Sequence, residues 1–394
     1  MKRNFLTLFC LAATLFIGCV EDDTADVIIN DNSVTNIDNG TGNSGNTVVN
    51  LSGVYTEDLL LDINTDYLIT GPVIIAPGAT FTIPAGMTLP SRPVGVNAYI
   101  AIQQGARIVA NGTASNPIVF TSSATTPGSG DWGGLVICGK AQINSTAMGS
   151  VETSTTEVGG LSYGGDTAGD DSGSLEYVRI EYAGGAIDGN SELNGLSLYA
   201  VGTGTNIDYV QIYQGSDDGI EFFGGTVNVN HLSVVGAEDD SVDWTEGYTG
   251  TITDVYVAHG SSHDKAFECD GYNTDFSNAG GYFSAPNVTN VTIVGANDGS
   301  EAVRLRAGTQ GIFTNVVLSD FAEGFDLDGD SGDNPTGQGV IDNLLQVNTV
   351  TFNNVTVNLK NDTGFMFTDA DFFTGIATAT GTDYSTWGAG WTRQ

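Results

Sequence analysis

The chain has 394 residues, with 11 Lys and Arg against 47 Asp and Glu, so its net charge at pH 7 is −36. A surface of this charge repels a phosphate backbone, which excludes nucleic acid as a partner. We interpret most of the charge as a source of solubility, and we expect bound calcium only where carboxylates cluster.

Residues 1–18 have the features of a secretory signal peptide. Two basic residues precede the apolar run from Phe5 to Ile17, which is too short to span a bilayer. Gly18 and Cys19 end this run and resemble a bacterial lipobox, with Phe16 where Leu is usual. The alternative is an ordinary cleaved signal with a chance cysteine. We expect Cys19 to be lipidated and to become the first mature residue.

Residues 19–50 are predicted to form a disordered acidic tether between the lipid and the fold. From residue 20 onward this segment has no aromatic and no basic residue, a composition typical of flexible linkers. Its acidic stretch from Glu21 to Asp23 resembles the export signal of Bacteroidetes-type lipoproteins. That resemblance implies a lipid-anchored protein on the extracellular face of the outer membrane.

Residues 51–394 are predicted to form one repeat domain, because two sets of short motifs recur with the same rhythm. The first set has intervals of 22, 23, 36, 25 and 39 residues and is anchored at Val210, Leu232, Val255, Val291, Val316 and Val355. The second set has intervals of 22, 25, 36, 22 and 40 residues and is anchored at Glu221, Asp243, Glu268, Arg304, Asp326 and Met366. Both sets indicate a unit of 22 to 25 residues with two longer insertions.

The repeat unit favours an all-β fold. Each unit alternates apolar and polar residues, is rich in β-branched residues and breaks at glycine, which is typical of short strands joined by bends. We therefore predict a right-handed, single-stranded parallel β-helix, a pectin-lyase-like solenoid whose equivalent residues stack about 4.8 Å apart. Asn290, Asn315 and Asn354 are expected to form a ladder at one bend.

The remaining parts of the body are assigned from composition. Residues 141–173 are predicted to be a polar insertion, and residues 368–394 an aromatic C-terminal cap over the last coil, whose edge would otherwise be open. Residues 51–140 supply the first coils and the N-terminal cap. Cys138 and Cys269 lie in apolar strands without metal-ligand spacing, so we expect two buried thiols.

The alternation also predicts an outward column of charged residues. In "GIEFF", Ile220 and Phe222 point inward and the glutamate between them points outward. The same parity assigns to the column Glu221, Asp243, Glu268, Arg304 and Asp326. Stacked carboxylates repel one another, so we expect Arg304 to neutralise part of the column and a calcium ion to bind Glu221, Asp243 and Glu268.

A second calcium candidate is the stretch "DLDGDSGDN". Its acids are Asp326, Asp328, Asp330 and Asp333, and their spacing resembles a D-x-D-x-D calcium loop. Ser331 stands where the turn glycine of an EF-hand belongs. The alternative interpretation is a solvated acidic loop.

Several stretches of the body carry a family resemblance. They are "GARIVANGTASNPIVFTSS", "GDWGGLVICGKAQIN", "LEYVRIEYAG", "DDGIEFFGGTVNVNHL" and the closing "WGAGWT". These stretches resemble a family of secreted bacterial β-helix lipoproteins common in Bacteroidetes. The resemblance implies fold and location, and it brings no established activity or catalytic residue.

Two functions follow from these observations. The favoured one is binding, in which an acidic rod on the cell surface contacts extracellular polysaccharide or a surface protein with calcium ordering its carboxylates. The alternative is a polysaccharide-degrading enzyme, because "SDDG", "EDDS", "AHG" and "RLR" are similar in order to the motifs of polygalacturonases. That similarity implies Asp218, Asp239 and Asp240 as the catalytic carboxylates, with His259 nearby. Arg304 would contact sugar carboxylates, or act as the base of a calcium-dependent lyase.

Overall fold

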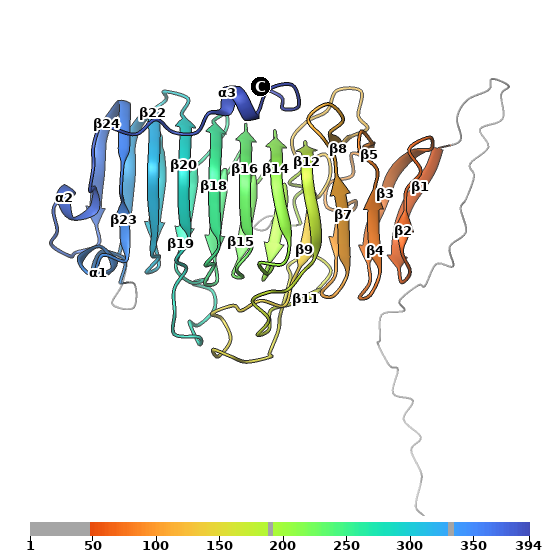
Figure 1. Cartoon of the computed structure of the whole chain (residues 1–394), viewed down its shortest axis with the longest axis horizontal. Helices are drawn as coiled ribbons and strands as arrows, with labels where there is room; N and C mark the ends of the chain where they lie inside the picture. Colours follow the sequence, from red (N-terminus) through yellow and green to blue (C-terminus); the bar gives the residue numbers. More distant parts are fainter. Residues whose placement is uncertain (1–47, 188–191, 330–334) are drawn as a thin grey trace, which may run out of the picture.

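The computed structural model describes residues 48–187, 192–329 and 335–394. Parallel strands stack coil upon coil along one axis (Figure 1), which confirms the predicted parallel β-helix. Cys19, the signal peptide and residues 19–47 of the tether lie outside the described residues. Strand β1 begins at Val48, so the end of the segment assigned to the tether belongs to the fold. Among the described residues, no helix has the length and apolar character that crossing a membrane requires.

The first coils are built from short strands. In chain order these are β1 (Val48–Tyr55), β2 (Leu59–Leu60), β3 (Asp66–Ile75), β4 (Thr80–Ile83), β5 (Thr88–Ser91), β6 (Ile100–Ile102), β7 (Arg107–Asn111), β8 (Ile118–Ser122) and β9 (Leu135–Cys138). The 141–173 region then adds β10 (Ser154–Thr155) and β11 (Ser162–Tyr163), which pair antiparallel to each other.

The later coils alternate a long and a short strand. The strands are β12 (Gly173–Glu181), β13 (Leu196–Tyr199), β14 (Asn206–Tyr213), β15 (Ile220–Phe223), β16 (Asn228–Val235), β17 (Val242–Thr245), β18 (Thr251–Ala258), β19 (Phe267–Asp270), β20 (Asn287–Val294), β21 (Glu301–Arg306), β22 (Gly311–Asp328), β23 (Leu345–Val347) and β24 (Val350–Asp362). The helices are α1 (Thr336–Ile341), α2 (Asp369–Phe372) and α3 (Tyr384–Trp387).

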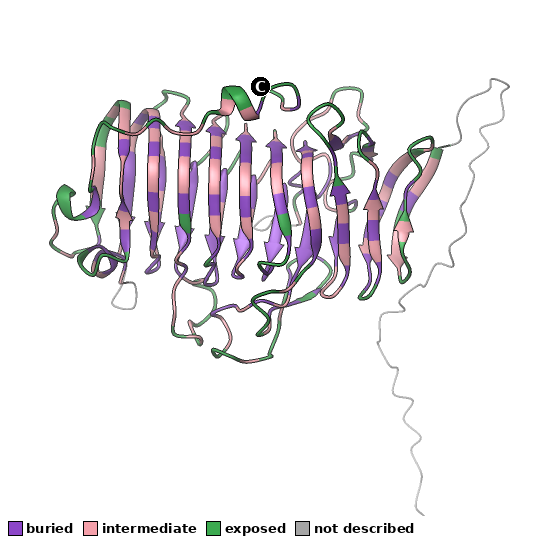
Figure 2. Cartoon of the chain, in the orientation of Figure 1, coloured by how far each residue is buried: buried purple, intermediate pink, exposed green. Residues whose placement is uncertain are grey.

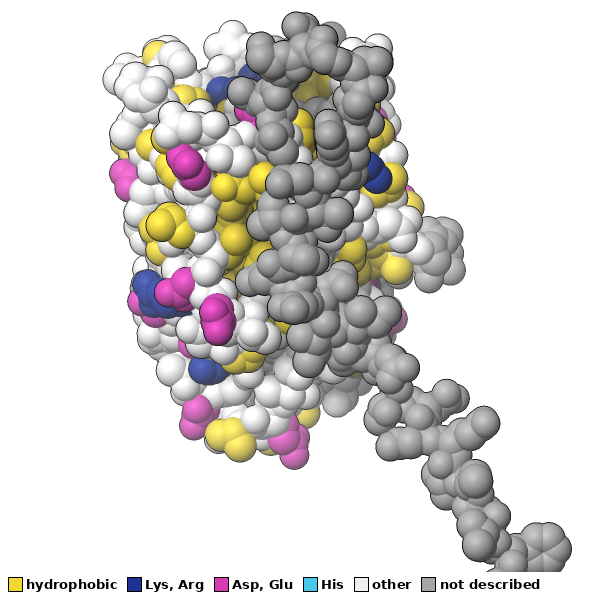
Figure 3. Space-filling model, turned by 90° about the vertical axis from the view of Figure 1, so that its right-hand side faces the viewer, with side chains coloured by type: hydrophobic (Ala, Val, Ile, Leu, Met, Phe, Trp, Pro, Cys, Tyr) yellow, Lys and Arg dark blue, Asp and Glu magenta, His cyan; other side chains and the backbone are white. Residues whose placement is uncertain are grey.

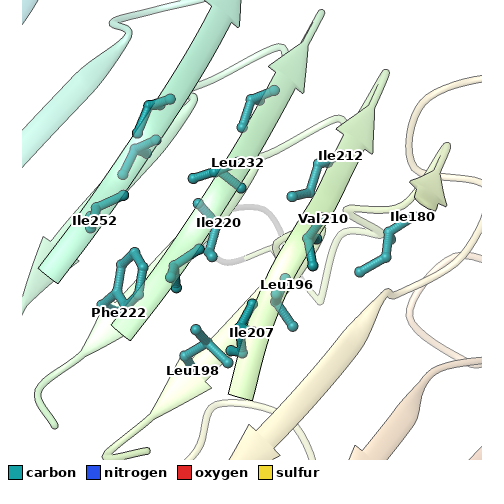
Figure 4. Close-up of a cluster of buried hydrophobic side chains, with 14 of the residues drawn as sticks. Ile180, Leu196, Leu198, Ile207, Val210, Ile212, Ile220, Phe222, Leu232 and Ile252 are labelled. Carbon is teal, nitrogen blue, oxygen red and sulfur yellow. The ribbon is translucent and has the colours of Figure 1, made fainter. Parts of the chain in front are cut away.

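Residues of alternating polarity place the core inside the coil. Along the long strands such as β18 and β20, buried positions alternate with partly exposed ones (Figure 2), whereas β6, β9, β13 and β19 are buried throughout. The inward side chains of successive coils stack into one apolar column (Figure 4). Ile220, Phe222 and Trp244 are fully buried, as the predicted parity requires. Cys138 and Cys269 are buried free thiols. This rigid interior fixes the height at which each outward side chain lies.

The predicted register is confirmed up to the penultimate coil and is wrong in the last one. Val291 pairs with Val316, but Val316 pairs with Val350 rather than with Val355. Likewise Lys360, and not Met366, continues the outward column after Asp326. The physical reason is that β22 and β24 run on without the turn that separates the two strands of the earlier coils.

The predicted asparagine ladder is two residues long. The amide of Asn315 donates to Asn290 Oδ1 at 2.8 Å, and the amide of Asn290 donates to Asp254 Oδ1 at 3.1 Å. Asn354 instead donates to Asp320 Oδ1 at 2.8 Å, at a different bend. The residues of both ladders have positive φ, a conformation that Asn and Asp tolerate better than most residues. The ladders therefore mark bends within the long strands.

The 141–173 insertion is less polar than predicted. Val158, Leu161 and Tyr163 are buried, and they pack on Tyr199 and Phe223, which project outward from the coils. This second apolar cluster lies outside the main core, and the insertion covers it. The insertion thus attaches a lobe to one side of the β-helix, where it hangs below the coils together with the β19–β20 loop (Figure 1).

The C-terminal segment covers more than the last coil. Helix α2 and Phe373 pack on Phe325 and Phe352, as a cap would. Residues 377–394, which we name the C-terminal strap, turn back across the coils (Figure 1). Thr380 N–H donates to Asn315 Oδ1 at 2.7 Å, and Arg393 reaches Glu181 of β12 at 3.1 Å. Residues 368–376 therefore cover the last coil as predicted. The strap, which includes Trp387 and Trp391, instead contacts several earlier coils.

The N-terminal end of the coil carries apolar and charged side chains side by side (Figure 3). The exposed apolar residues nearest this end are Val48, Leu60 and Ile63. In this view the described residues form no patch of one charge sign. The concentration of carboxylates lies elsewhere, on the flank of the coil.

Candidate functional site

An acidic cleft of about 600 Å³ opens on the flank formed by strands β13, β15, β17 and β19. Its lining contains ten carboxylates and no Lys or Arg. The lining residues are Glu157, Glu192, Asn194, Ser216, Asp217, Asp218, Glu221, Phe223, Glu238, Asp239, Asp240, Asp243, Glu268 and Asn273. We name this surface the acidic cleft.

The cleft begins where the outward column changes from apolar to charged. Ala101 and Val136 stack under Ser197, and Ser197 pairs in register with Glu221. The insertion covers the apolar part of this column. Glu157 of the insertion then lines the cleft beside the charged part, so the lobe forms one wall of the site.

Three carboxylates on the cleft floor form the candidate cation site. One ligand oxygen each of Asp218, Glu221 and Asp243 lies within 4.8 Å of the other two. The amide of Asn194 donates to Glu221 Oε2 at 2.6 Å, and the backbone N–H of Asp240 donates to Asp218 Oδ1 at 3.0 Å. These bonds orient two of the three carboxylates.

Among the carboxylates that line the cleft, Asp243 has a buried oxygen that the described residues leave unsatisfied. Its Oδ1 is buried and has no hydrogen-bond partner. A buried acceptor without a partner costs about 1–3 kcal/mol, and a charged one costs more. Asp243 therefore needs a proton or a cation.

Burial and mutual repulsion hold protons on the cleft carboxyls. Burial, with the neighbouring Asp243, raises the pKa of Asp218 well above its ordinary range, and burial raises the pKa of Glu221 and Asp243 in the same direction. For Asp217, burial with Asp239 and Glu192 raises the pKa to about 7. At neutral pH the cleft without a cation is therefore partly protonated.

A neighbouring group of acids is already neutralised by the chain. Lys265 Nζ lies 3.1 Å from Glu268 Oε1 and also contacts Asp264, while Arg306 contacts Glu268 and Asp270. Glu268 was expected to hold calcium together with Glu221 and Asp243. The structure instead gives Glu268 two basic partners, so the floor trio is the better cation site.

The predicted enzyme residues are only partly brought together. Asp218, Asp239 and Asp240 all line the cleft, whereas His259 and Arg304 do not. His259 stacks on His263 with ring centroids 4.1 Å apart, and burial lowers its pKa to about 4.

Arg304 neutralises part of the column, as predicted, through Asp326 on one side only. It pairs with Glu301 at 2.8 Å and lies near Asp326 and Asp328, but it does not bridge to Glu268. The acids are also close together, because oxygens of Asp239 lie within 4.8 Å of both Asp218 and Asp240. An inverting hydrolase separates its two carboxyls by about 6.5–9.5 Å.

The second calcium candidate takes a different form in the structure. Asp326 and Asp328 belong to the end of β22 rather than to a loop, and Asp330 and Asp333 lie outside the described residues. Lys360 Nζ contacts Asp326 Oδ2 at 2.8 Å. The basic partners of Asp326 reduce its need for a cation.

Several cleft residues were not predicted from the sequence. Glu157, Glu192 and Glu238 lie on segments between strands, where no period applies. Asn194 lies two residues before β13 in "ELNGL". The sequence offered one signal for Asn194. A polar residue also lies two positions before the equivalent strand in the next two coils, as Asp218 before β15 and Asp240 before β17.

The donor set of the floor trio fits a hard divalent cation such as calcium. All of its donors are carboxylate oxygens, which suit hard cations, and neither Cys nor His lines the cleft. The orphaned Asp243 oxygen is the observation that requires a positive partner. Asp218, Glu221 and Asp243 would hold the ion.

The stacked coils and the flank cleft place the chain in the class of parallel β-helix proteins with a lateral polar site. The chain belongs to the family described as pectate-lyase like beta helix domain, whose model matches residues 53–392. No curated protein and no solved structure matched it in two further comparisons. The match confirms the pectin-lyase-like fold, which by itself assigns no reaction. The narrower resemblance to bacterial lipoproteins stays a prediction.

Proposed function

We propose that this protein is a surface-displayed lipoprotein whose acidic cleft binds calcium and, through it, extracellular polysaccharide without cleaving it. The observation that carries the proposal is the floor trio of Asp218, Glu221 and Asp243, with its unpartnered buried oxygen and no basic residue in the lining. The extended flank of a solenoid suits a polymeric ligand.

Binding is favoured over catalysis because the candidate basic residues lie outside the cleft. Arg304, the candidate lyase base, pairs with Glu301, and His259 stacks on His263. A protein surface partner in place of polysaccharide is an outcome of the same experiment.

The test is a calcium titration by calorimetry, followed by retention and reducing-end assays on neutral, basic and acidic polysaccharides with and without calcium. We expect calcium binding, calcium-dependent retention and no release of reducing ends. The Glu57→Gln, Asp342→Asn variant, which removes two exposed acids outside the cleft, should behave as the parent does. Release that Asp239→Asn, Asp240→Asn abolishes would establish the enzyme instead. A body that binds neither calcium nor any polysaccharide would contradict the proposal.

The lipid anchor has its own test. We expect Cys19→Ser to abolish metabolic labelling with a fatty acid and to remove the protein from the surface of intact cells, because a single thiol carries the anchor. Protease digestion of intact cells, followed by immunoblotting, measures display. A Cys10→Ser variant, altered inside the signal peptide, is the matched control. Unchanged labelling of Cys19→Ser would show that the cysteine is incidental.

A further inference from the structure

We propose that the acidic cleft selects an amine-bearing sugar chain and rejects polyuronates, an inference that rests on the proposed binding function and names its ligand class. The family description refers to pectate, an acidic polymer. The cleft of this chain has the opposite requirement, because every charged side chain in its lining is an acid.

The charge balance of the cleft excludes an acidic ligand. Ten carboxylates line it. Lys265 and Arg306 contact Glu268, and one calcium ion on the floor trio neutralises two further charges, so the lining as a whole stays negative. Each sugar carboxylate then meets like charge, which costs affinity and steers the polymer away. A ligand that carries ammonium groups instead supplies the missing positive charges.

The nearest basic side chains are engaged by acids of the chain. Lys265 contacts Asp264 and Glu268, and Arg306 contacts Glu268 and Asp270. Neither base belongs to the lining, and no Lys or Arg of the described ranges remains there to receive a sugar carboxylate.

The rim of the cleft repeats one acid per coil. Asp217 has an oxygen within 4.8 Å of one in Asp239, and Asp239 has one within 4.8 Å of Asp264, which lies just outside the lining and shares its charge with Lys265. Asp239 and Asp264 are exposed. The three carboxylates thus form a row along the axis of the coil, and the unpartnered oxygen of Asp243 lies in the floor beside it.

The spacing of this row favours an amino sugar over a basic peptide. Stacked strands are about 4.8 Å apart, whereas side chains on one face of an extended peptide recur every ~6.8 Å, two residues at ~3.4 Å each. One pyranose unit with its linkage spans close to one coil. A chain of glucosamine units running along the axis therefore offers about one unit to each rim acid.

The experiment measures the affinity of the full chain, in detergent and with calcium, for four probes of equal length. The probes are hexamers of glucosamine, N-acetylglucosamine, galacturonate and lysine. We expect the glucosamine hexamer to bind at least about tenfold more tightly than its N-acetylated match, because acetylation removes the ammonium charge. We expect no binding of galacturonate.

Two variants of equal net charge distinguish binding in the cleft from the nonspecific attraction of a cationic sugar to an acidic protein. Asp217→Asn, Asp239→Asn should weaken glucosamine binding about tenfold, while Glu57→Gln, Asp342→Asn should leave it unchanged. Thermal melting confirms that both variants fold. Equal losses in both variants, tighter binding of lysine hexamer, or preference for galacturonate would each overturn the inference. Calcium-dependent retention of a neutral or acidic glycan in the same assay would leave the proposed function standing, whereas loss of all calcium and glycan binding would remove both.

Discussion

Asp243→Asn is expected to abolish calcium binding in the cleft and, in the absence of metal, to make the protein more stable. Asp243 stacks between Glu221 and Glu268, and its buried Oδ1 has no hydrogen-bond partner. Burial and those two neighbours raise its pKa well above the ordinary range, so its ionised form is unfavourable in the folded state. The neutral amide removes that charge and can donate to either glutamate. We expect a gain of about 1–3 kcal/mol in the free energy of unfolding at pH 7.

With calcium the order of stability reverses. At a calcium concentration one thousand times its Kd, the parent gains about 4.1 kcal/mol, and a variant that does not bind the ion gains nothing. Denaturant unfolding in chelator and in calcium measures both differences. Asp254→Asn, whose carboxylate already accepts hydrogen bonds from Asn290 and Thr382 outside the cleft, is the control and should keep its calcium affinity. Unchanged calcium affinity in Asp243→Asn would place the cation elsewhere.

The columns of the β-helix were predictable because the sequence carries two periods, the two-residue alternation of a strand and the repeat of about 22 residues. The side-chain alternation fixes which residues face inward, and the 22-residue unit fixes which ones stack. Together they place Glu221 beside Asp243 and Asp243 beside Glu268, as the structure does. Local sequence is sufficient here, since every coil repeats the same backbone path.

The last coil was not predictable by the same logic. "NNVTV" around Val355 reads like the start of a strand, but its equivalent in the register is Val350. Strand β22 passes through two bends, at Asn315 and Asp320, without a glycine turn. A motif search that relies on turns therefore assigns the wrong residue, although the strands themselves are recognised.

The ion pairs within the site depend on the length and conformation of the side chains. The strand register predicts only which residues are neighbours along the backbone. Arg304 is the in-register neighbour of Glu268, yet Arg306 and Lys265 make the ion pairs to that glutamate. Glu157 comes from the insertion, which has no repeat to align. The sequence thus predicted the acidic flank and several of its members, but not which carboxylates remain without a base.

Glu246→Gln is expected to reduce the loss of stability between pH 5 and pH 7 by the contribution of one titrating carboxyl, while the cleft carboxyls, whose pKa burial also raises, keep their own contributions. Glu246 is fully buried where the insertion lobe meets the coil, and both of its carboxyl oxygens accept the hydroxyl of Tyr163, at 3.0 and 3.1 Å. Ser145 Oγ donates to it at 3.3 Å, and its hydrogen bonds include no Lys or Arg among the described residues. Burial raises its pKa to about 7 from the ordinary value of 4.5.

The sign follows from proton binding. Between pH 4.5 and about pH 7 the folded chain keeps a proton on Glu246 that the unfolded chain has lost, so the free energy of unfolding falls as the pH rises. Its stabilising contribution is full below pH 4.5 and is lost above pH 7, a change of about 3 kcal/mol. Glutamine does not titrate. The slope of the free energy of unfolding against pH should therefore be smaller in the variant, by up to the contribution of one bound proton. The residual slope belongs to carboxyls such as Asp217.

Tyr163→Phe provides the matched control, because it removes one donor to the ionised carboxylate and keeps the ring. The Tyr163 hydrogen bond lowers the pKa of Glu246, so its loss should move the fall in stability to higher pH. Denaturant midpoints from pH 4 to pH 9 measure the three profiles, and protease cleavage within residues 143–164 reports whether the lobe loosens first. Parallel profiles for the parent and Glu246→Gln would mean that Glu246 is ionised throughout this range. The lobe would then be held against a buried charge, and the wall that it contributes to the acidic cleft would be independent of pH.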